Sequence, residues 1–380
     1  MADRAQPHFT PDYAIPPGET LSEVMDSLSI SQAELAERTD RPKKTINEII
    51  KGKAAITPET ALQFERVLGV PASFWNNLEQ NYRTALARKD ERARLEKQLG
   101  FLTHFPVKDM TKRNWLRPCD TAVEQLTELL NYFGVASPKA WHTHWETIQQ
   151  DASFRRGGGQ GQSFGAVAAW LRQGHIEARA VREQYSPKPY NADRFRLELN
   201  AIRHLTNAHM PGAAEEMQQR CASAGVVVAL VEELPKARVC GATSWLTPDL
   251  ALIQLSLYYH RDDQFWFSFF HEAGHVLLHG KRSIFVEPAK SGSKQGIGSG
   301  TRVEEEEANT FAANTLIPPS AWDAFVAASD FEESSIAAFA AELEIAPGIV
   351  VGRLQREKLL PYNRGTSLFR KLIWDKTSAA

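Results

Sequence analysis

The sequence predicts a mainly α-helical protein with one small β-sheet, an α+β architecture. Apolar residues recur at helical spacing over most of the chain, for example in "AVEQLTELLNYF" at residues 122–133. Around Gly225 the pattern changes to short β-branched or alternating runs, at 225–231, 239–246 and 250–259, which predict three strands. With 380 residues, the chain is long enough for two or three domains.

Composition excludes several classes of protein. The formal net charge is −2, so no general attraction to nucleic acid or anionic membrane follows, and any basic surface must be local. The cysteines are three in number and widely separated, which predicts neither a zinc knuckle nor a disulfide framework. The N-terminal stretch lacks the apolar core of a signal peptide, and no apolar run is long enough to span a bilayer. We therefore expect a cytoplasmic protein with no membrane partner.

The first helical module, at residues 30–75, contains its own start and stop signals. Ser31 and Glu34 form a capping-box pattern before a short helix. After a tight turn, a second helix is predicted from about Pro42 to Lys51, closed by Gly52, and Thr57 caps the next helix. This order of short helix, turn and short helix is the arrangement that places a recognition helix in the major groove of DNA.

The second helix of this module has two distinct faces. Ile46, Ile49 and Ile50 share the inner face, whereas four polar residues lie outward near the N-terminus, namely Lys43, Lys44, Thr45 and Asn47. Residues 31–53 carry six basic and four acidic side chains, a modest local excess of positive charge. Tight binding to double-stranded DNA, such as its own promoter, is therefore expected to require a homodimer or the basic residues of 83–97.

A metal site is predicted by "HEAGH" at residues 271–275, on a helix expected over 263–279. His271 and His275 lie one helical turn apart on one face, so both imidazoles can bind the same zinc ion. Glu272 can accept the proton of a zinc-activated water. His279 continues the same stripe, and we expect a structural role for it rather than substrate orientation.

The third protein ligand is expected from the helix that begins with four glutamates. Its small apolar face comprises Ala308, Ala312 and Leu316, at a spacing of four. Glu305 is one turn before Asn309 and two turns before Ala312, which places it on this packed side and selects it as the ligand, with Glu304 and Glu307 as alternatives. Asn309 is then expected to hydrogen-bond the back nitrogen of a zinc histidine.

These motifs resemble a known family. "FHEAGHVLLHG" and "EEEANTFAANTLIP" are similar to the ImmA/IrrE family of zinc metallopeptidases, and the similarity extends to "IAPGIVVGRLQ" and "AAWLRQGHIEA", over roughly residues 165–375. The resemblance implies a zincin-like domain with one Zn²⁺ per chain, held by His271, His275 and Glu305, with Glu272 as catalytic base. It also implies a protein substrate, because family members cleave or inactivate a partner repressor.

The N-terminal module has a second resemblance. Residues 30–75 and the following "SFWNNLEQNYR" are similar to the Xre-type helix-turn-helix of HigA-like antitoxins. By this resemblance Gln32 contacts a phosphate, and Lys43, Lys44 and Asn47 read or grip the groove.

Together these patterns predict five segments. They are an N-terminal arm (1–18), a helix-turn-helix domain (19–82), a helical connector (83–210), a zincin-like metallopeptidase domain (211–323) and a helical C-terminal region (324–380). The function expected is that of a zinc endopeptidase that regulates transcription by cleaving a partner repressor, an antitoxin or itself. Its substrate is expected to lie along the strand at 241–246. The alternative is a non-proteolytic regulator or antitoxin that uses a peptidase-like domain as a sensor.

Overall fold

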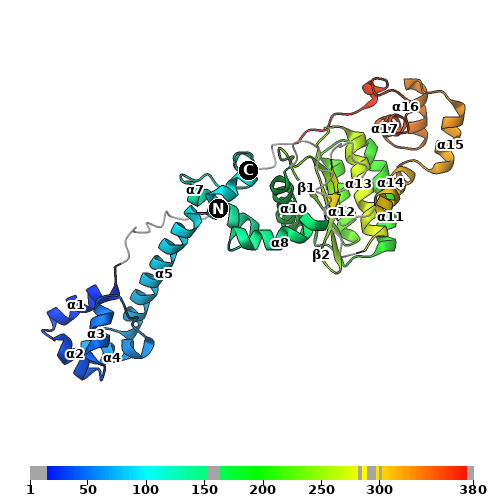
Figure 1. Ribbon diagram of the computed structural model, residues 1–380. Coiled ribbons are helices and arrows are strands. Elements are labelled where there is room, and N and C mark those ends of the chain that lie inside the picture. Colours follow the sequence, from blue (N-terminus) through cyan, green and yellow to red (C-terminus); the bar gives the residue numbers. More distant parts are fainter. Residues whose placement is uncertain (1–14, 152–162, 281–284, 289–296, 299–301, 375–380) are drawn as a thin grey trace. The chain divides into compact units, whose positions relative to one another are not determined.

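The computed structural model describes residues 15–151, 163–280, 285–288, 297–298 and 302–374. The chain divides into two compact units, Met1–Leu99 and Gly100–Ala380 (Figure 1). Most of the predicted arm, the glycine-rich stretch at 155–162 and most of the glycine- and serine-rich stretch at 290–301 lie outside the described residues. The mainly helical prediction is confirmed.

The first unit is all helical. Its helices are α1 (Pro17–Ser27), α2 (Gln32–Arg38), α3 (Lys43–Ile50), α4 (Pro58–Leu68) and α5 (Ala72–Glu96). The Ser31 hydroxyl accepts the Glu34 backbone N–H at 3.2 Å, while the Glu34 carboxylate pairs with Arg38. Thr57 caps α4 by accepting the N–H of Thr60 at 3.3 Å. The predicted caps therefore begin both helices, although Glu34 is engaged with Arg38.

The core of this unit fixes the register of its helices. It contains fully buried side chains from α1 to α5, namely Leu21, Leu35, Ile46, Phe64 and Trp75. Glu79, on α5, is also buried and accepts the Ile56 N–H at 3.1 Å, which ties α5 to the segment before α4. Because α5 is continuous from Ala72 to Glu96, the boundary predicted between residues 82 and 83 falls inside one helix.

The second unit begins with helices and ends with helices. Before the sheet lie η1 (Leu99–His104), α6 (Val107–Lys112), α7 (Ala122–Phe133), α8 (Pro138–Asp151), α10 (Phe164–Tyr185), α11 (Ala192–His204), η2 (Leu205–Asn207) and α12 (Gly212–Ser223). Within and after it lie α13 (Asp262–Leu278), α14 (Arg302–Leu316), α15 (Pro319–Ala328), α16 (Glu333–Glu342), α17 (Pro347–Arg356) and η3 (Thr366–Leu368).

One mixed sheet runs through the second unit in the order β1-β3-β2-β4-β5. Its strands are β1 (Val226–Leu230), β2 (Val239–Thr247), β3 (Leu250–Leu255), β4 (Phe285–Pro288) and β5 (Ile297–Gly298). β1 is parallel to β3, and the other pairs are antiparallel. The three predicted strands are present. β4 and β5 were not predicted, because they are very short and owe their extended conformation to pairing with β2 and with each other.

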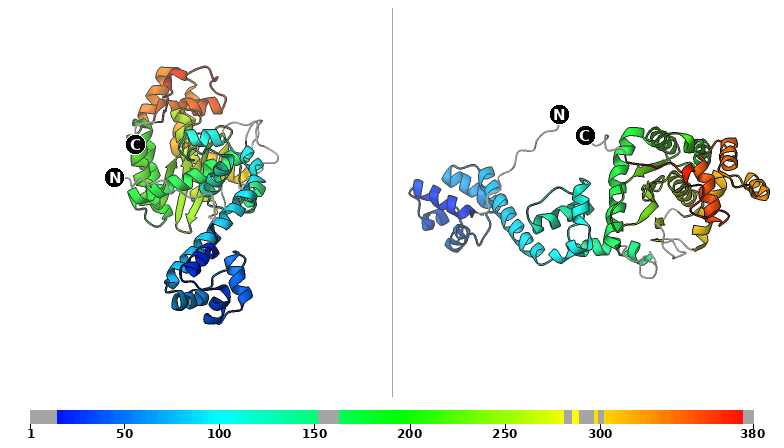
Figure 2. Two further views of the ribbon diagram at one scale, coloured as in Figure 1. Left: turned by 90° about the vertical axis from the view of Figure 1, so that its left-hand side faces the viewer. Right: turned by 90° about the horizontal axis from the view of Figure 1, so that it is seen from above.

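The helices around the sheet position the functional site. α13 packs against β2 and β3 and lies beside α14, while α10 and α12 pack on β1. Phe269, Phe270 and Ala273 of α13 are fully buried in the main core, so the helix is held along its length. In Figures 1 and 2 the C-terminal helices α15–α17, drawn in orange to red, lie together at one end of this unit.

Within the described ranges, no single helix is long and apolar enough to cross a bilayer. Only α16 and α17 taken together reach the necessary length and composition, and they are bent by 116° to each other.

Candidate metal centre

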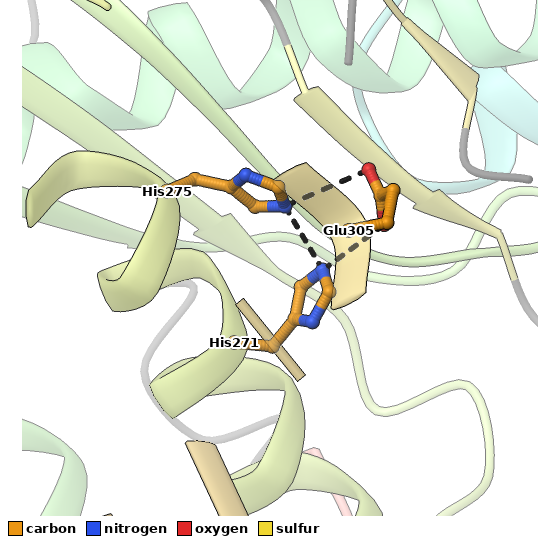
Figure 3. Close-up of side chains that lie close together, drawn as sticks. All are labelled: His271, His275 and Glu305. Atoms are coloured by element: carbon orange, nitrogen blue, oxygen red, sulfur yellow. Dashed lines mark hydrogen bonds and ion pairs between the residues drawn. The ribbon is translucent and has the colours of Figure 1, made fainter. Parts of the chain in front are cut away.

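Helix α13 brings the two motif histidines together. The Nε2 atoms of His271 and His275 lie 3.0 Å apart, and both side chains are buried (Figure 3). The predicted helix, 263–279, differs from the observed one by a single residue at each end. Helical spacing alone is therefore enough to predict that these two side chains lie together.

Helix α14 contributes one carboxylate to this cluster, that of Glu305. Its Oε2 is 3.5 Å from His271 Nε2 and its Oε1 is 3.6 Å from His275 Nε2. The other glutamates of the run differ: Glu304 is half-buried, Glu306 is exposed and pairs with Arg302, and Glu307 pairs with His279. Among the described residues, His271, His275 and Glu305 form the group of possible metal donors.

The back nitrogen of His271 is held by Asn309, as the helix geometry predicts. His271 Nδ1 lies 3.2 Å from Asn309 Oδ1, and that same oxygen accepts a hydrogen bond of 2.9 Å from the Arg356 guanidinium on α17. Since a guanidinium only donates, the Asn309 atom between them is an oxygen, and His271 must carry its proton on Nδ1. The lone pair of His271 Nε2 then faces the cluster. The contribution of Arg356 was not predicted.

The back nitrogen of His275 meets a second histidine instead. His275 Nδ1 lies 2.8 Å from His279 Nδ1, and His279 Nε2 lies 3.1 Å from Glu307 Oε2. In the tautomer of His279 whose Nε2–H donates to this carboxylate, Nδ1 accepts a hydrogen bond from His275. The pKa of His275 is lowered to about 2, mainly by burial and also by the neighbouring His271 and His279, which favours the neutral ring.

The arrangement fits a zinc ion. Two lone pairs that face each other at 3.0 Å beside a carboxylate repel unless a cation lies between them. Ligands at about 2.0 Å from a tetrahedral ion are about 3.3 Å apart. The two Nε2 atoms are 3.0 Å apart, and each has a different oxygen of the Glu305 carboxylate at 3.5 or 3.6 Å, which is close to this spacing. Two histidines and one carboxylate are a donor set of catalytic zinc sites, in which the fourth position is left for water.

Glu272 follows His271 on α13, and its side chain lies against β2. It is fully buried, and the Thr243 hydroxyl donates to its Oε2 at 2.6 Å. A Cβ atom at Gly241 would lie 2.7 Å from Glu272 Oε1, so only glycine lets the strand approach this carboxylate. On the other face of α13, Gly274 lets α14 approach, because a Cβ there would be 3.1 Å from the Ala308 backbone.

β4 pairs with β2, the strand along which the substrate is predicted to lie. β2 is paired with β3 and β4 at both Gly241 and Thr243, so strand addition at these residues is not available in this structure. Phe285 of β4 also stacks on the His275 ring, with centroids 4.0 Å apart and planes 18° apart. The prediction for 241–246 is therefore wrong for its first part, because β4 supplies the partner that the sequence does not reveal.

The predicted DNA-contacting residues lie on α2 and α3 of the first unit. Lys43 and Lys44 are exposed at the N-terminus of α3, while Gln32, Thr45 and Asn47 are half-buried. Ile46 and Ile49, on the opposite face of α3, are buried in the core, as predicted. The polar face of α3 is thus presented to solvent.

Comparison with known families agrees with both halves of this description. Residues 21–75 match the family model described as helix-turn-helix. Residues 247–355 match the model of peptidase family M78 described as the IrrE N-terminal-like domain. The chain contains a helix-turn-helix domain and an IrrE N-terminal-like domain of family M78. The second match contains His271, Glu272, His275 and Glu305, but it is narrower than the predicted 165–375 and leaves out 168–178.

The N-terminal domain also has similar relatives among curated proteins. The HTH-type transcriptional regulator YddM of Escherichia coli (strain K12) is 34% identical over 73 residues, which is 19% of this chain and 78% of that protein. Virulence-associated protein I of Dichelobacter nodosus is 33% identical over 81 residues, 21% of this chain and 75% of that protein.

Two solved structures are similar to the same domain. One is an addiction module antidote protein of the HigA family from Coxiella burnetii, 33% identical, covering 22% of this chain and 92% of that chain with a TM-score of 0.21. The other is PA4674 from Pseudomonas aeruginosa in complex with its operator DNA, 33% identical, covering 20% of this chain and 82% of that chain with a TM-score of 0.19.

Proposed function

We propose that this protein is a zinc-dependent endopeptidase coupled to a DNA-binding helix-turn-helix domain. The observation that supports it best is the convergence of His271, His275 and Glu305, with two lone pairs facing each other, on a helix that also carries the buried carboxylate of Glu272. A purely structural zinc site is normally closed by four protein ligands, whereas this cluster offers three and a neighbouring base.

The chemistry divides between the metal and the chain. A zinc ion held by the three donors would polarise a peptide carbonyl and lower the pKa of a bound water. Glu272 would accept the proton of the attacking water and later deliver it to the leaving amine. The Thr243 hydroxyl orients the Glu272 carboxylate, and Asn309 and Arg356 hold His271 in the tautomer that the metal requires.

The N-terminal domain would bring this peptidase to DNA. Lys43 and Lys44 are exposed on α3, as phosphate or base contacts require, with Gln32, Thr45 and Asn47 nearby. We infer that the protein binds its own promoter as a homodimer. Its proteolytic target would be a partner repressor or antitoxin, or the chain's own segment near residues 83–100, cleaved under stress.

A second candidate function is supported by β4. Because this strand pairs with Gly241 and Thr243 and stacks Phe285 on His275, the edge next to Glu272 is occupied. A non-proteolytic regulator or antitoxin that uses a metal-binding domain as a sensor needs no access for a peptide. It also needs no catalytic base, so the two functions differ in their dependence on Glu272.

Glu272→Gln tests the choice between them. This substitution keeps the size of the side chain and removes the base, so zinc content and DNA binding should remain while cleavage falls by at least about 100-fold. Wild type and variant are compared in cells under the inducing stress, by following target-gene expression and protein fragments. If both derepress the same genes equally and no fragment differs, the peptidase function is refuted and the sensor function is favoured.

A further inference from the structure

The two zinc-binding histidines of the proposed centre are oriented by different devices. His271 is held by a neutral amide, Asn309, which is itself fixed by Arg356. His275 is held by His279, which ends on the carboxylate of Glu307. The second device involves His279, which the peptidase reaction does not use and for which the sequence predicts a structural role.

The surroundings of His275 show why it needs such a partner. Stacking against Phe285 fixes the plane of the ring. It does not distinguish the two orientations related by a half-turn about Cβ–Cγ, in only one of which Nε2 faces His271 and Glu305. The bond from His275 Nδ1 to His279 Nδ1, 2.8 Å long, is formed in one orientation only. Because the His275 side chain is 0% exposed, water is not available to replace this acceptor.

Glu307 determines whether His279 is able to accept. An imidazole that donates from Nε2 to a carboxylate has its lone pair on Nδ1, toward His275. Without the carboxylate, the other tautomer of His279 would point a proton at the proton of His275. The His279 side chain is 3% exposed and that of Glu307 is 54% exposed, so the chain of contacts runs from the buried metal centre to a carboxylate at the surface.

We propose that His279 and Glu307 are positioning residues for the metal centre, which fix the ring orientation and the tautomer of His275. The proposal rests on the zinc centre of the proposed function. It assigns to Glu307, which is on the helix that supplies the ligand Glu305, a part in zinc affinity without direct contact with the ion.

Substitution of His279 gives a sharp test, because asparagine and leucine differ in the relevant atom. The amide oxygen of asparagine occupies a place equivalent to Nδ1 and accepts a hydrogen bond, whereas leucine offers no acceptor. In the full-length chain, zinc Kd is measured by competition with a chelator. His279→Leu should raise Kd by about 10–100-fold, the usual effect of losing a hydrogen-bond partner of a ligand. His279→Asn should restore Kd to within about 3-fold of wild type.

Glu307→Ala tests the outer half of the device. It should raise Kd by about 3–10-fold, near or below the lower end of this range because Glu307 is half-exposed. Glu306→Ala is the matched control, since it removes the same charge one residue earlier, where the side chain pairs with Arg302. In a His279→Asn background Glu307→Ala should have no further effect, because an amide has no tautomer to select.

The outcomes separate positioning from a general structural role. The melting temperature of the metal-free protein is followed for every variant. A rise in Kd that asparagine reverses supports positioning, and it is not expected if His279 only fills space. Unchanged Kd in His279→Leu, or no recovery in His279→Asn, overturns the proposal while leaving the zinc centre intact. Wild-type protein that binds no zinc overturns the metal centre itself and the positioning role with it.

Discussion

Removal of the Glu305 carboxylate should separate zinc binding from folding. At a free zinc concentration about 100 times the wild-type Kd, binding stabilises the folded state by about 2.7 kcal/mol. Glu305 Oε2 and Oε1 are 3.5 and 3.6 Å from the two imidazole nitrogens, so Glu305→Ala deletes one of the three donors. Removing a ligand should weaken zinc binding more than removing a hydrogen-bond partner of a ligand does. The zinc Kd of Glu305→Ala should therefore rise by at least about 100-fold.

The effect on stability follows from this change in Kd. At the same free zinc, occupancy falls to half or less, and the stabilisation by zinc falls to about 0.4 kcal/mol or less. For a domain of about 150–250 residues, 1 kcal/mol corresponds to about 2–4 °C in melting temperature. The difference of about 2.3 kcal/mol therefore corresponds to about 5–9 °C. Zinc should therefore raise the melting temperature of wild type much more than that of the variant.

The assay combines elemental analysis with thermal unfolding in zinc buffer and in chelator. Glu306→Ala is the control, because Glu306 is exposed and pairs with Arg302 outside the cluster. It should keep both the zinc and the shift in melting temperature. If Glu306→Ala or Glu307→Ala strips the zinc and Glu305→Ala does not, the assignment of the ligand from the helix face is wrong.

Three further predictions concern the ligands, the base and the DNA. His271→Ala and His275→Ala should each abolish stoichiometric zinc, and unchanged zinc content by elemental analysis would contradict the site. Gly241→Ala places a Cβ atom 2.7 Å from Glu272 Oε1, so the carboxylate must shift. Cleavage should fall by at least about 10-fold with zinc content unchanged, because misplacing a catalytic group by about 1 Å costs up to about 100-fold in rate. A variant as active as wild type would show that Glu272 tolerates the shift. Replacing Lys43 and Lys44 together by Ala should abolish the gel shift of promoter DNA, and the affinity of wild type for this DNA should fall steeply with salt. Wild-type protein that does not bind promoter fragments at low salt would favour a protein-docking role for this domain.

Those features of the protein that depend on spacing along one helix could be predicted from the residues alone. A separation of four residues places His271 and His275 on one face of α13. Glu305 precedes Asn309 by four residues and Ala312 by seven, which places it on the packed side of α14 together with Asn309. The same holds for the N-terminal domain, where Ser31 begins α2 by accepting a backbone N–H. Local geometry is enough in these cases, because helical period and capping chemistry involve only near neighbours in the sequence.

Tertiary structure alone decided which distant residues meet the metal centre. Arg356 reaches Asn309 from α17, and Glu307 reaches His279 although it lies about 200° around α14 from Glu305. The crossing of α14 over α13 places both glutamates beside histidines one turn apart, and no periodicity within α14 specifies that crossing. Likewise β4 covers β2 because of pairing between segments that are far apart in the sequence, and such pairing leaves no local pattern in a strand of four residues.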